Sequence, residues 1–155
     1  MIYASDGPRM PQHTAAALRA RVRRGDECFL SLAGERVAAF RWACARQARL
    51  GNLDLVLPLR SDEVCAYEVF TAPAFRGKGV RDPVRHAFVE SYRQRGFRAL
   101  VNYRTPGRKP WARSHQHRVA IIRTLRLGPF RRFWVRTYGP QAAYWRERLK
   151  ELRWA

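Results

Sequence analysis

The chain has 155 residues, enough for one domain that buries its core without disulfides or structural metals. Hydrophobic residues make up 46% of the sequence and aromatic residues 12%, which excludes an intrinsically disordered chain despite a formal net charge of +19. This charge either keeps the protein in solution or attracts an anionic partner, such as RNA, an acidic acyl carrier protein or a phosphorylated substrate.

Cysteine usage and the lack of long apolar runs predict a cytoplasmic protein. Cys28, Cys44 and Cys65 follow no zinc or redox spacing, and each lies in an apolar stretch, so we expect buried, reduced thiols. No apolar run is long enough to span a membrane, and residues 1–7 lack the apolar core of a signal peptide. We therefore expect no membrane span, and no pattern of ligating residues predicts a metal site.

The first half of the chain predicts a helix followed by strands. Residues 11–24 place Ala15, Leu18 and Val22 on one helical face, with arginines on the other. Gly34 then forms the turn of a β-hairpin. The strands expected in this half cover residues 28–32, 36–43, 53–57 and 64–71.

The second half predicts further helices and strands. A helix over residues 82–94 has Pro83 in its first turn and Gly96 after its end. Two prolines, a glycine, four basic residues and Trp111 predict a loop over residues 104–113. The other elements expected here are a strand at 99–103, a helix at 114–127, a strand at 130–138 and a C-terminal helix at 140–155.

The order of these elements predicts a mixed α/β fold. An antiparallel hairpin precedes the alternating helices and strands, which excludes a doubly wound dinucleotide-binding fold. In the helix expected over residues 114–127, Val119, Ile122 and Leu125 recur at helical spacing and Gly128 follows the last turn.

The strongest functional motif is the loop between strand 64–71 and helix 82–94. Its residues 76–81 read Arg-Gly-Lys-Gly-Val-Arg. Glycines let phosphate oxygens approach the backbone, and successive amides at a helix N-terminus bind anions. Arg76 and Lys78 add positive charge. The alternative interpretation is a plain glycine turn between a strand and a helix.

Residues 69–80 resemble motif A of the GNAT superfamily of acyltransferases. That motif reads arginine or glutamine, two residues, glycine, one residue, and then glycine or alanine. Arg76 and Gly79 fit this pattern, whereas Arg81 stands where glycine or alanine is usual. The resemblance extends over about residues 24–138. Its other segments are the second and third strands of the family at 24–42 and a later helical motif at 117–128.

The resemblance implies a mixed central sheet with helices on both faces and a splayed strand pair, 64–71 and 99–103, that forms an acyl-CoA cleft. Acetyl-CoA or another acyl-CoA is then the co-substrate, with its pyrophosphate on the amides of the glycine loop. The whole chain, 1–155, is then one domain whose first strand is short or missing. The residues implied to contact the co-substrate are Val69, Phe70, Thr71, Arg76, Gly77, Lys78, Gly79, Val80, Arg81 and His117.

For catalysis, the resemblance implies direct transfer of the acyl group to an amine, with a backbone amide of strand 64–71 polarising the thioester carbonyl. Glu68 and Glu63 are the candidates for the base, although either could instead pair with an arginine. Tyr103 and Ser114 are the candidates for the acid, because Thr124 aligns with the tyrosine that often has this role in the family.

Two other functions fit the sequence. The loop 104–113, with Trp111, could stack on RNA bases and pair with phosphates, which would make the chain a GNAT-like binding module. Alternatively, the positive charge could steer an acyl carrier protein that serves as the acyl donor. The acceptor amine could belong to a sugar, a small molecule, a protein or an aminoacylated tRNA.

Overall fold

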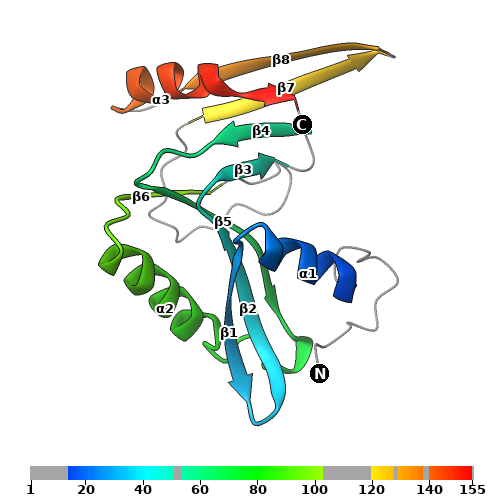
Figure 1. Cartoon of the computed structure of the whole chain (residues 1–155), viewed down its shortest axis with the longest axis vertical. Helices are drawn as coiled ribbons and strands as arrows, with labels where there is room; N and C mark the ends of the chain where they lie inside the picture. The colour runs from blue at the N-terminus through cyan, green and yellow to red at the C-terminus, as the bar shows by residue number, and fades with distance from the viewer. Residues whose placement is uncertain (1–13, 51–53, 103–119, 128, 138–139, 155) are drawn as a thin grey trace. The chain divides into compact units, whose positions relative to one another are not determined.

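A four-stranded mixed sheet forms the centre of the first of two units into which the chain divides (Figure 1). The computed structural model describes residues 14–50, 54–102, 120–127, 129–137 and 140–154. The first unit consists of residues 1–46 and 59–102, and the second of residues 47–58 and 103–155. One domain over the whole chain stays a prediction.

The sheet of the first unit combines antiparallel and parallel strands. β1 (Glu27–Ala33) and β2 (Arg36–Cys44) form the predicted hairpin, and β5 (Glu63–Thr71) pairs with β2 antiparallel. β6 (Ala99–Val101) pairs with β5 in parallel, so the strand order is β1-β2-β5-β6. This sheet confirms the mixed α/β class. It also confirms that the strands predicted at 64–71 and 99–103, which are β5 and β6, are parallel neighbours.

One helix lies on each face of this sheet, as predicted (Figure 1). Successive residues of a strand point to opposite faces. On one face, Phe88 and Tyr92 of α2 (Arg81–Gln94) pack in a cluster with Ala43 of β2. On the other face, the neighbouring Trp42 lies beneath the guanidinium of Arg21, which belongs to α1 (Ala15–Arg23).

Aromatic rings fill the space between the sheet and α2. Phe88, only 1% exposed, meets Phe29 of β1 edge to face at a centroid distance of 5.5 Å. Tyr92 meets Phe97 in the same way at 4.9 Å. Each such pair adds about 0.5–1.5 kcal/mol to the burial of its apolar area. Gly96, with a φ of +85°, ends α2 and returns the chain so that Phe97 packs on the helix, which confirms the predicted helix and its end.

The buried face of α1 differs from the prediction. Leu18 is buried as expected, but Val22 is 63% exposed and Arg21 is only 8% exposed. Arg21 occupies the inward position because its guanidinium lies 5.1 Å from the centre of the Trp42 ring and pairs with the Glu68 carboxylate. A charged side chain thus replaces the expected apolar residue in this face.

The second unit contains a three-stranded sheet, a β-hairpin and a helix. β3 (Gln47–Leu50), β4 (Leu55–Pro58) and β9 (Arg153–Trp154) form the sheet in that order. β4 confirms the predicted short strand, whereas β3 was not predicted. β8 (Phe130–Thr137) confirms the expected late strand. The C-terminal helix, α3 (Ala142–Arg148), is shorter than expected because a 3₁₀ turn and β9 follow it.

The expected helix over residues 114–127 is wrong in its described part, since residues 120–127 form strand β7 (Ala120–Leu127). β7 pairs antiparallel with β8, with Leu127 opposite Phe130. The β-branched residues Ile121, Ile122 and Thr124 favour a strand, and pairing with β8 outweighs the helical spacing of the apolar residues. Thr124 was aligned with the family tyrosine through a motif that is helical, so a strand at this position makes that alignment wrong as well.

Two of the three cysteines are buried, as predicted, and one is not. Cys44 and Cys65 are buried as expected and lie opposite each other on β2 and β5, but Cys28 is exposed, contrary to expectation. Cys28 lies on β1, the first strand in the order of the sheet, where alternate residues face solvent. Burial raises the pKa of the Cys65 thiol to about 12. Within the described residues, every helix is too short or too polar to cross a bilayer.

Candidate functional site

The glycine loop joins β5 to α2 through a short 3₁₀ turn, Pro73–Phe75. Gly77 and Gly79 have φ angles of +76° and +70°, in the left-handed region that glycine adopts without strain. A Cβ atom on Gly79 would lie 3.9 Å from the Asp82 carboxylate, and one on Gly77 would meet open space. Backbone conformation, rather than crowding, is therefore why the loop needs glycine.

Four consecutive amides of this loop are available to bind an anion. Among the described residues, the backbone N–H groups of Gly77, Lys78, Gly79 and Val80 donate no recorded hydrogen bond. Val80 is the N-cap residue of α2, and its side chain caps no amide of the helix. Because α2 has 14 residues, the partial positive charge at its N-terminus adds to these donors.

Positive side chains lie on the loop itself. The Nε atom of Arg76 is 3.4 Å from the carbonyl oxygen of Thr71, a long contact at the hydrogen-bond limit. The Nζ atom of Lys78 is 5.9 Å from the centre of the Phe75 ring. Both side chains are exposed, so each can turn toward an anion held by the amides.

A third arginine, Arg41 of β2, adds charge beside the first turns of α2. Its guanidinium carbon lies 5.3 Å from the centre of the Phe88 ring, and its Nε atom is buried without a hydrogen-bond partner among the described residues. Burial lowers the pKa of Arg41, and the nearby charges of Arg81 and Arg85 lower it further. The mutual repulsion of these guanidinium groups would be relieved by an anion bound close to them.

The outer half of β5 has a free edge next to the loop. The pairing with β6 covers only Glu63–Cys65 on β5, although β5 continues to Thr71. Within the described residues, the part of β5 from residue 66 to 71 pairs with β2 alone. Val69 is 42% exposed in this part, and the Thr71 hydroxyl is buried without a described partner. An extended ligand could therefore bind along this edge through backbone hydrogen bonds.

Glu68 lies at a β-bulge in the same part of β5. The register between β2 and β5 shifts here, with Arg41 opposite Val69 but Trp42 opposite Tyr67, so Glu68 is the extra residue. Its φ of +45° is uncommon for a residue with a side chain and costs on the order of 1 kcal/mol. Bulges and left-handed residues of this kind re-aim side chains and are frequent beside active sites.

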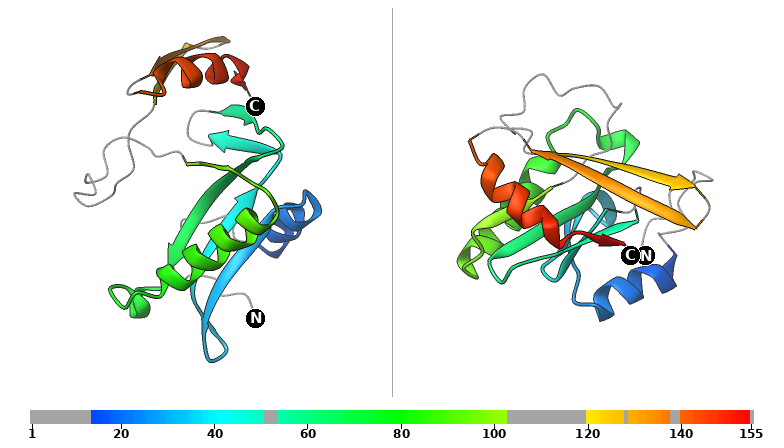
Figure 2. Two further views of the ribbon diagram at one scale, coloured as in Figure 1. Left: turned by 90° about the vertical axis from the view of Figure 1, so that its left-hand side faces the viewer. Right: turned by 90° about the horizontal axis from the view of Figure 1, so that it is seen from above.

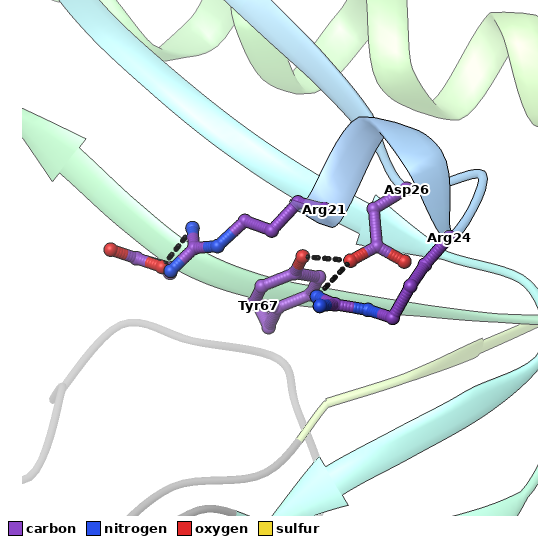
Figure 3. Close-up of polar contacts among 5 residues, drawn as sticks. Arg21, Arg24, Asp26 and Tyr67 are labelled. Atoms are coloured by element: carbon purple, nitrogen blue, oxygen red, sulfur yellow. Dashed lines mark hydrogen bonds and ion pairs between the residues drawn. The ribbon is translucent and has the colours of Figure 1, made fainter. Parts of the chain in front are cut away.

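Arg21, Arg24, Asp26 and Tyr67 form a polar cluster on the α1 face of the sheet (Figure 3), and Glu68 joins this cluster through Arg21. Arg21 pairs with Glu68, and its guanidinium carbon lies 5.6 Å from the centre of the Tyr67 ring. The Tyr67 hydroxyl donates to Oδ2 of Asp26 at 2.6 Å, and Arg24 donates to the same oxygen at 2.8 Å. Burial, followed by the hydrogen bond to Asp26, raises the pKa of Tyr67 well above its ordinary value.

Of the other predicted catalytic residues, Glu63 lies in the described part of the chain, and it is not brought together with Glu68. Glu63 is the first residue of β5, only 1% exposed, and its Oε2 atom accepts a hydrogen bond from the Arg60 amide at 3.0 Å. It lies at the opposite end of the strand from the glycine loop. Tyr103, Ser114 and His117 lie outside the described residues, as does the loop with Trp111. Among the described residues, no three histidine, cysteine or acidic side chains gather around a common point.

We expect Tyr67→Phe to destabilise the protein by about 1–2 kcal/mol, because it removes a hydrogen bond to a buried, charged carboxylate. Asp26 is only 7% exposed and would retain Arg24 as its described partner. Urea denaturation followed by circular dichroism measures the change, with Tyr144→Phe, at a side chain that is 45% exposed, as the control. Equal stability of the two variants would contradict this role of the hydroxyl.

Several residues of the site could not be identified from the sequence. Asp26 and Tyr67 are 41 residues apart, and nothing in the local pattern of either indicates the other. Arg41 looks like one of 28 arginines, and only the packing of α2 on β2 shows that it lies beside the loop. A polar residue within an otherwise apolar strand was the available indication for Arg41, and such a residue also fits a solvent-facing position.

Comparisons with known proteins concern the fold. No protein-family model matches the sequence, and no curated protein matches it. A solved structure of AAC(6')-Iy with the bisubstrate analogue CoA-S-monomethyl-acetylneamine has 21% identity and a TM-score of 0.48, with 63% of this chain and 67% of that chain covered. The aminoglycoside N-acetyltransferase AAC(6')-Iy with CoA has 20% identity and a TM-score of 0.42, with 66% and 88% covered. An acetyltransferase of Trypanosoma brucei has 13% identity and a TM-score of 0.44, with 66% and 75% covered. Because the TM-scores are below 0.5, these similarities carry no argument about substrate or mechanism, which are argued from the geometry of the chain itself.

Proposed function

We propose that this chain is a GNAT acyltransferase that transfers an acetyl or other acyl group from acyl-CoA to an amine. The observation that supports this most directly is the run of amides at Gly77, Lys78, Gly79 and Val80, at the start of α2, which have no hydrogen-bond partner within the described part of the chain. A pyrophosphate is the ligand for which such a run of donors, a helix N-terminus and basic side chains are suited. The free edge of β5 next to it suits the amide-containing pantetheine arm of CoA.

The chemistry of the proposed transfer requires few groups from the protein. The lone pair of the amine attacks the thioester carbonyl, the C–N bond forms, the C–S bond breaks, and the thiolate leaves and takes up a proton. A backbone amide of β5 near Val69 or Phe70 would stabilise the negative charge on the carbonyl oxygen. Glu68 would accept the proton that the amine loses, and its ion pair with Arg21 holds the carboxylate in place.

Calorimetry with acetyl-CoA tests the first half of this proposal. We expect one molecule to bind per chain, and S-acetyl-pantetheine, which lacks the pyrophosphate, to bind at least tenfold more weakly, because charge-assisted hydrogen bonds contribute about 1.5–3 kcal/mol each. Release of free thiol in the presence of a panel of amino sugars, polyamines and peptide amines tests the second half. Absence of acetyl-CoA binding, or binding without transfer to any amine of the panel, would contradict the proposal.

An acyl carrier protein is the alternative donor, because of the net charge of +19. The same thiol-release assay separates the two donors when acetyl-CoA and an acetylated carrier protein are compared at equal concentration. We expect acetyl-CoA to be used, since the free amides of the glycine loop match a pyrophosphate, which the carrier-bound pantetheine lacks.

Arg81, the first residue of α2, should strengthen acyl-CoA binding by pairing with a phosphate. We expect Arg81→Gly to weaken acetyl-CoA binding about fivefold to 20-fold and to make the binding less dependent on salt, since one charge-assisted contact is lost. Arg93→Gln, in the last turn of the same helix, is the control for the change in net charge. Tighter binding by Arg81→Gly would show instead that this side chain obstructs the pyrophosphate site.

A further inference from the structure

The outer face of strand β8 carries an alternating row of aromatic and basic side chains. Phe130 is 52% exposed and Trp134 is 49% exposed, and Arg132 and Arg136 are exposed as well. These four residues occupy every second position of β8, so they project from one face at intervals of about 7 Å. The hairpin of β7 and β8 extends past α3 (Figures 1 and 2).

The opposite face of β8 is the one that packs within the unit. Phe133 meets Trp154 of β9 edge to face at 5.8 Å, and the guanidinium carbon of Arg131 lies 5.9 Å from the centre of the same ring. These contacts fix the orientation of the strand. The exposed aromatic residues are therefore not needed to hold the hairpin in place. About half of the surface of each ring faces solvent, so the free energy that burial of this apolar surface would contribute is not gained.

The charge around this face is strongly positive. Residues 120–137 contain five arginines and no acidic residue. In the second unit as a whole, lysine and arginine outnumber aspartate and glutamate by 15 to 3, so the smaller unit carries most of the net charge. A second copy of this chain is a poor partner for such a face, because arginines would then meet arginines.

We propose that the face formed by Phe130, Arg132, Trp134 and Arg136 binds single-stranded RNA. Rings exposed on a strand provide stacking surfaces for unpaired bases, and arginines between them pair with the phosphates that link those bases. Because every base has a stacking face, binding of this kind depends little on sequence. This face belongs to the second unit and the glycine loop to the first, and RNA binding does not depend on acyl transfer.

The test uses the intact protein and a fluorescent oligouridylate of about 12 nucleotides, within the usual site size of single-strand binding surfaces. Fluorescence anisotropy should show binding that weakens with salt, and a duplex of the same length should bind more weakly because its bases are already stacked. Trp134→Ala should weaken binding to the single strand about tenfold, and Trp134→Phe should restore most of it, since the ring rather than the indole N–H is required.

A pair of charge variants separates this face from a general attraction to the positive protein. Arg132→Gln should weaken binding and reduce the slope of log affinity against log salt by about 0.7, which corresponds to one phosphate contact on a single strand. Arg146→Gln, an exposed arginine of α3, removes the same charge elsewhere in the unit and should change the slope far less. Acetyl-CoA binding should be unchanged in all four variants.

Three results would overturn the proposal. Equal losses in Arg132→Gln and Arg146→Gln, with no loss in Trp134→Ala, would mean that only net charge attracts the RNA. Sedimentation showing a dimer that Trp134→Ala dissociates, without an effect on the oligouridylate, would assign the face to a contact between copies. Binding to phosphatidylserine vesicles that depends on Trp134, with no binding of the oligouridylate, would assign it to a membrane surface.

Discussion

Gly79→Glu is expected to weaken acetyl-CoA binding at least 100-fold. Gly79 has a φ of +70°, and a residue with a side chain pays about 1–2 kcal/mol in that conformation. The new carboxylate would lie beside Asp82 and next to the amides that we propose hold the pyrophosphate, so two like charges would face the phosphates. Strain and repulsion together exceed the 2.7 kcal/mol that corresponds to about 100-fold.

Two further variants divide this effect between its causes. Gly79→Ala introduces the strain without the charge. Its loop can leave the left-handed conformation in the free protein and must regain it to bind the ligand, so we expect binding to be about tenfold weaker, in line with about 1–2 kcal/mol of strain. Gly96→Glu places the same side chain at the other end of α2, where φ is +85° and a Cβ meets open space, so it should lower stability but not affinity. If calorimetry gives Gly79→Glu the affinity of the wild type, the pyrophosphate does not bind to this loop.

Glu68→Gln is expected to lower kcat about 100-fold to 1000-fold with the best acceptor amine, because a general base usually contributes a factor of this size. Glutamine keeps the shape of the side chain and can still meet Arg21, but it cannot take up a proton. Since Glu68 lies on the bulge and not in the glycine loop, the affinity for acetyl-CoA should stay within twofold of the wild type.

The pH dependence of turnover distinguishes a base from a structural carboxylate. If a carboxylate acts as the base, the acidic limb of the wild-type pH profile of kcat should be missing from the residual activity of Glu68→Gln. Glu63→Gln is the matched control, because it alters a buried carboxylate on the same strand that accepts the Arg60 amide. It should reduce stability and leave kcat near the wild-type value. Equal kcat in Glu68→Gln and the wild type would remove Glu68 from the mechanism.

Elements whose ends are marked by glycine, proline or turn residues nearby in the sequence were predicted well. The helix α2 follows a proline and glycine-rich loop and ends before Gly96, so its limits were visible in about 20 residues of sequence. The hairpin of β1 and β2 was equally clear, because a Gly-Glu turn separates two runs of apolar and β-branched residues. The glycine loop could be predicted for the same reason, since its left-handed glycines and its basic residues are close in sequence.

The features that were missed depend on contacts between distant residues. Arg21 is buried because Trp42 and Glu68, on two different strands, lie beneath it, and no pattern within α1 indicates either of them. The strand β7 was mistaken for a helix because apolar residues three apart fit a helical face, and only pairing with β8 decides between the two structures. The bulge at Glu68 likewise results from a register shift against β2, which strand propensity does not show.

The way the second unit is assembled has a consequence for the order of events during synthesis. β3 and β4 emerge between β2 and β5, but β4 pairs with β9, and Trp154 follows its partner Leu55 by 99 residues. At about 5–20 residues per second, the ribosome needs about 5–20 s to make that stretch. Once β6 has been made, the first unit has all of its described strands, whereas Leu55, Val56 and Leu57, which are at most 5% exposed in the finished fold, still lack the last strand of their sheet. A chaperone that recognises short apolar strands would therefore bind the nascent chain after β6 has been made and before β9 has been made.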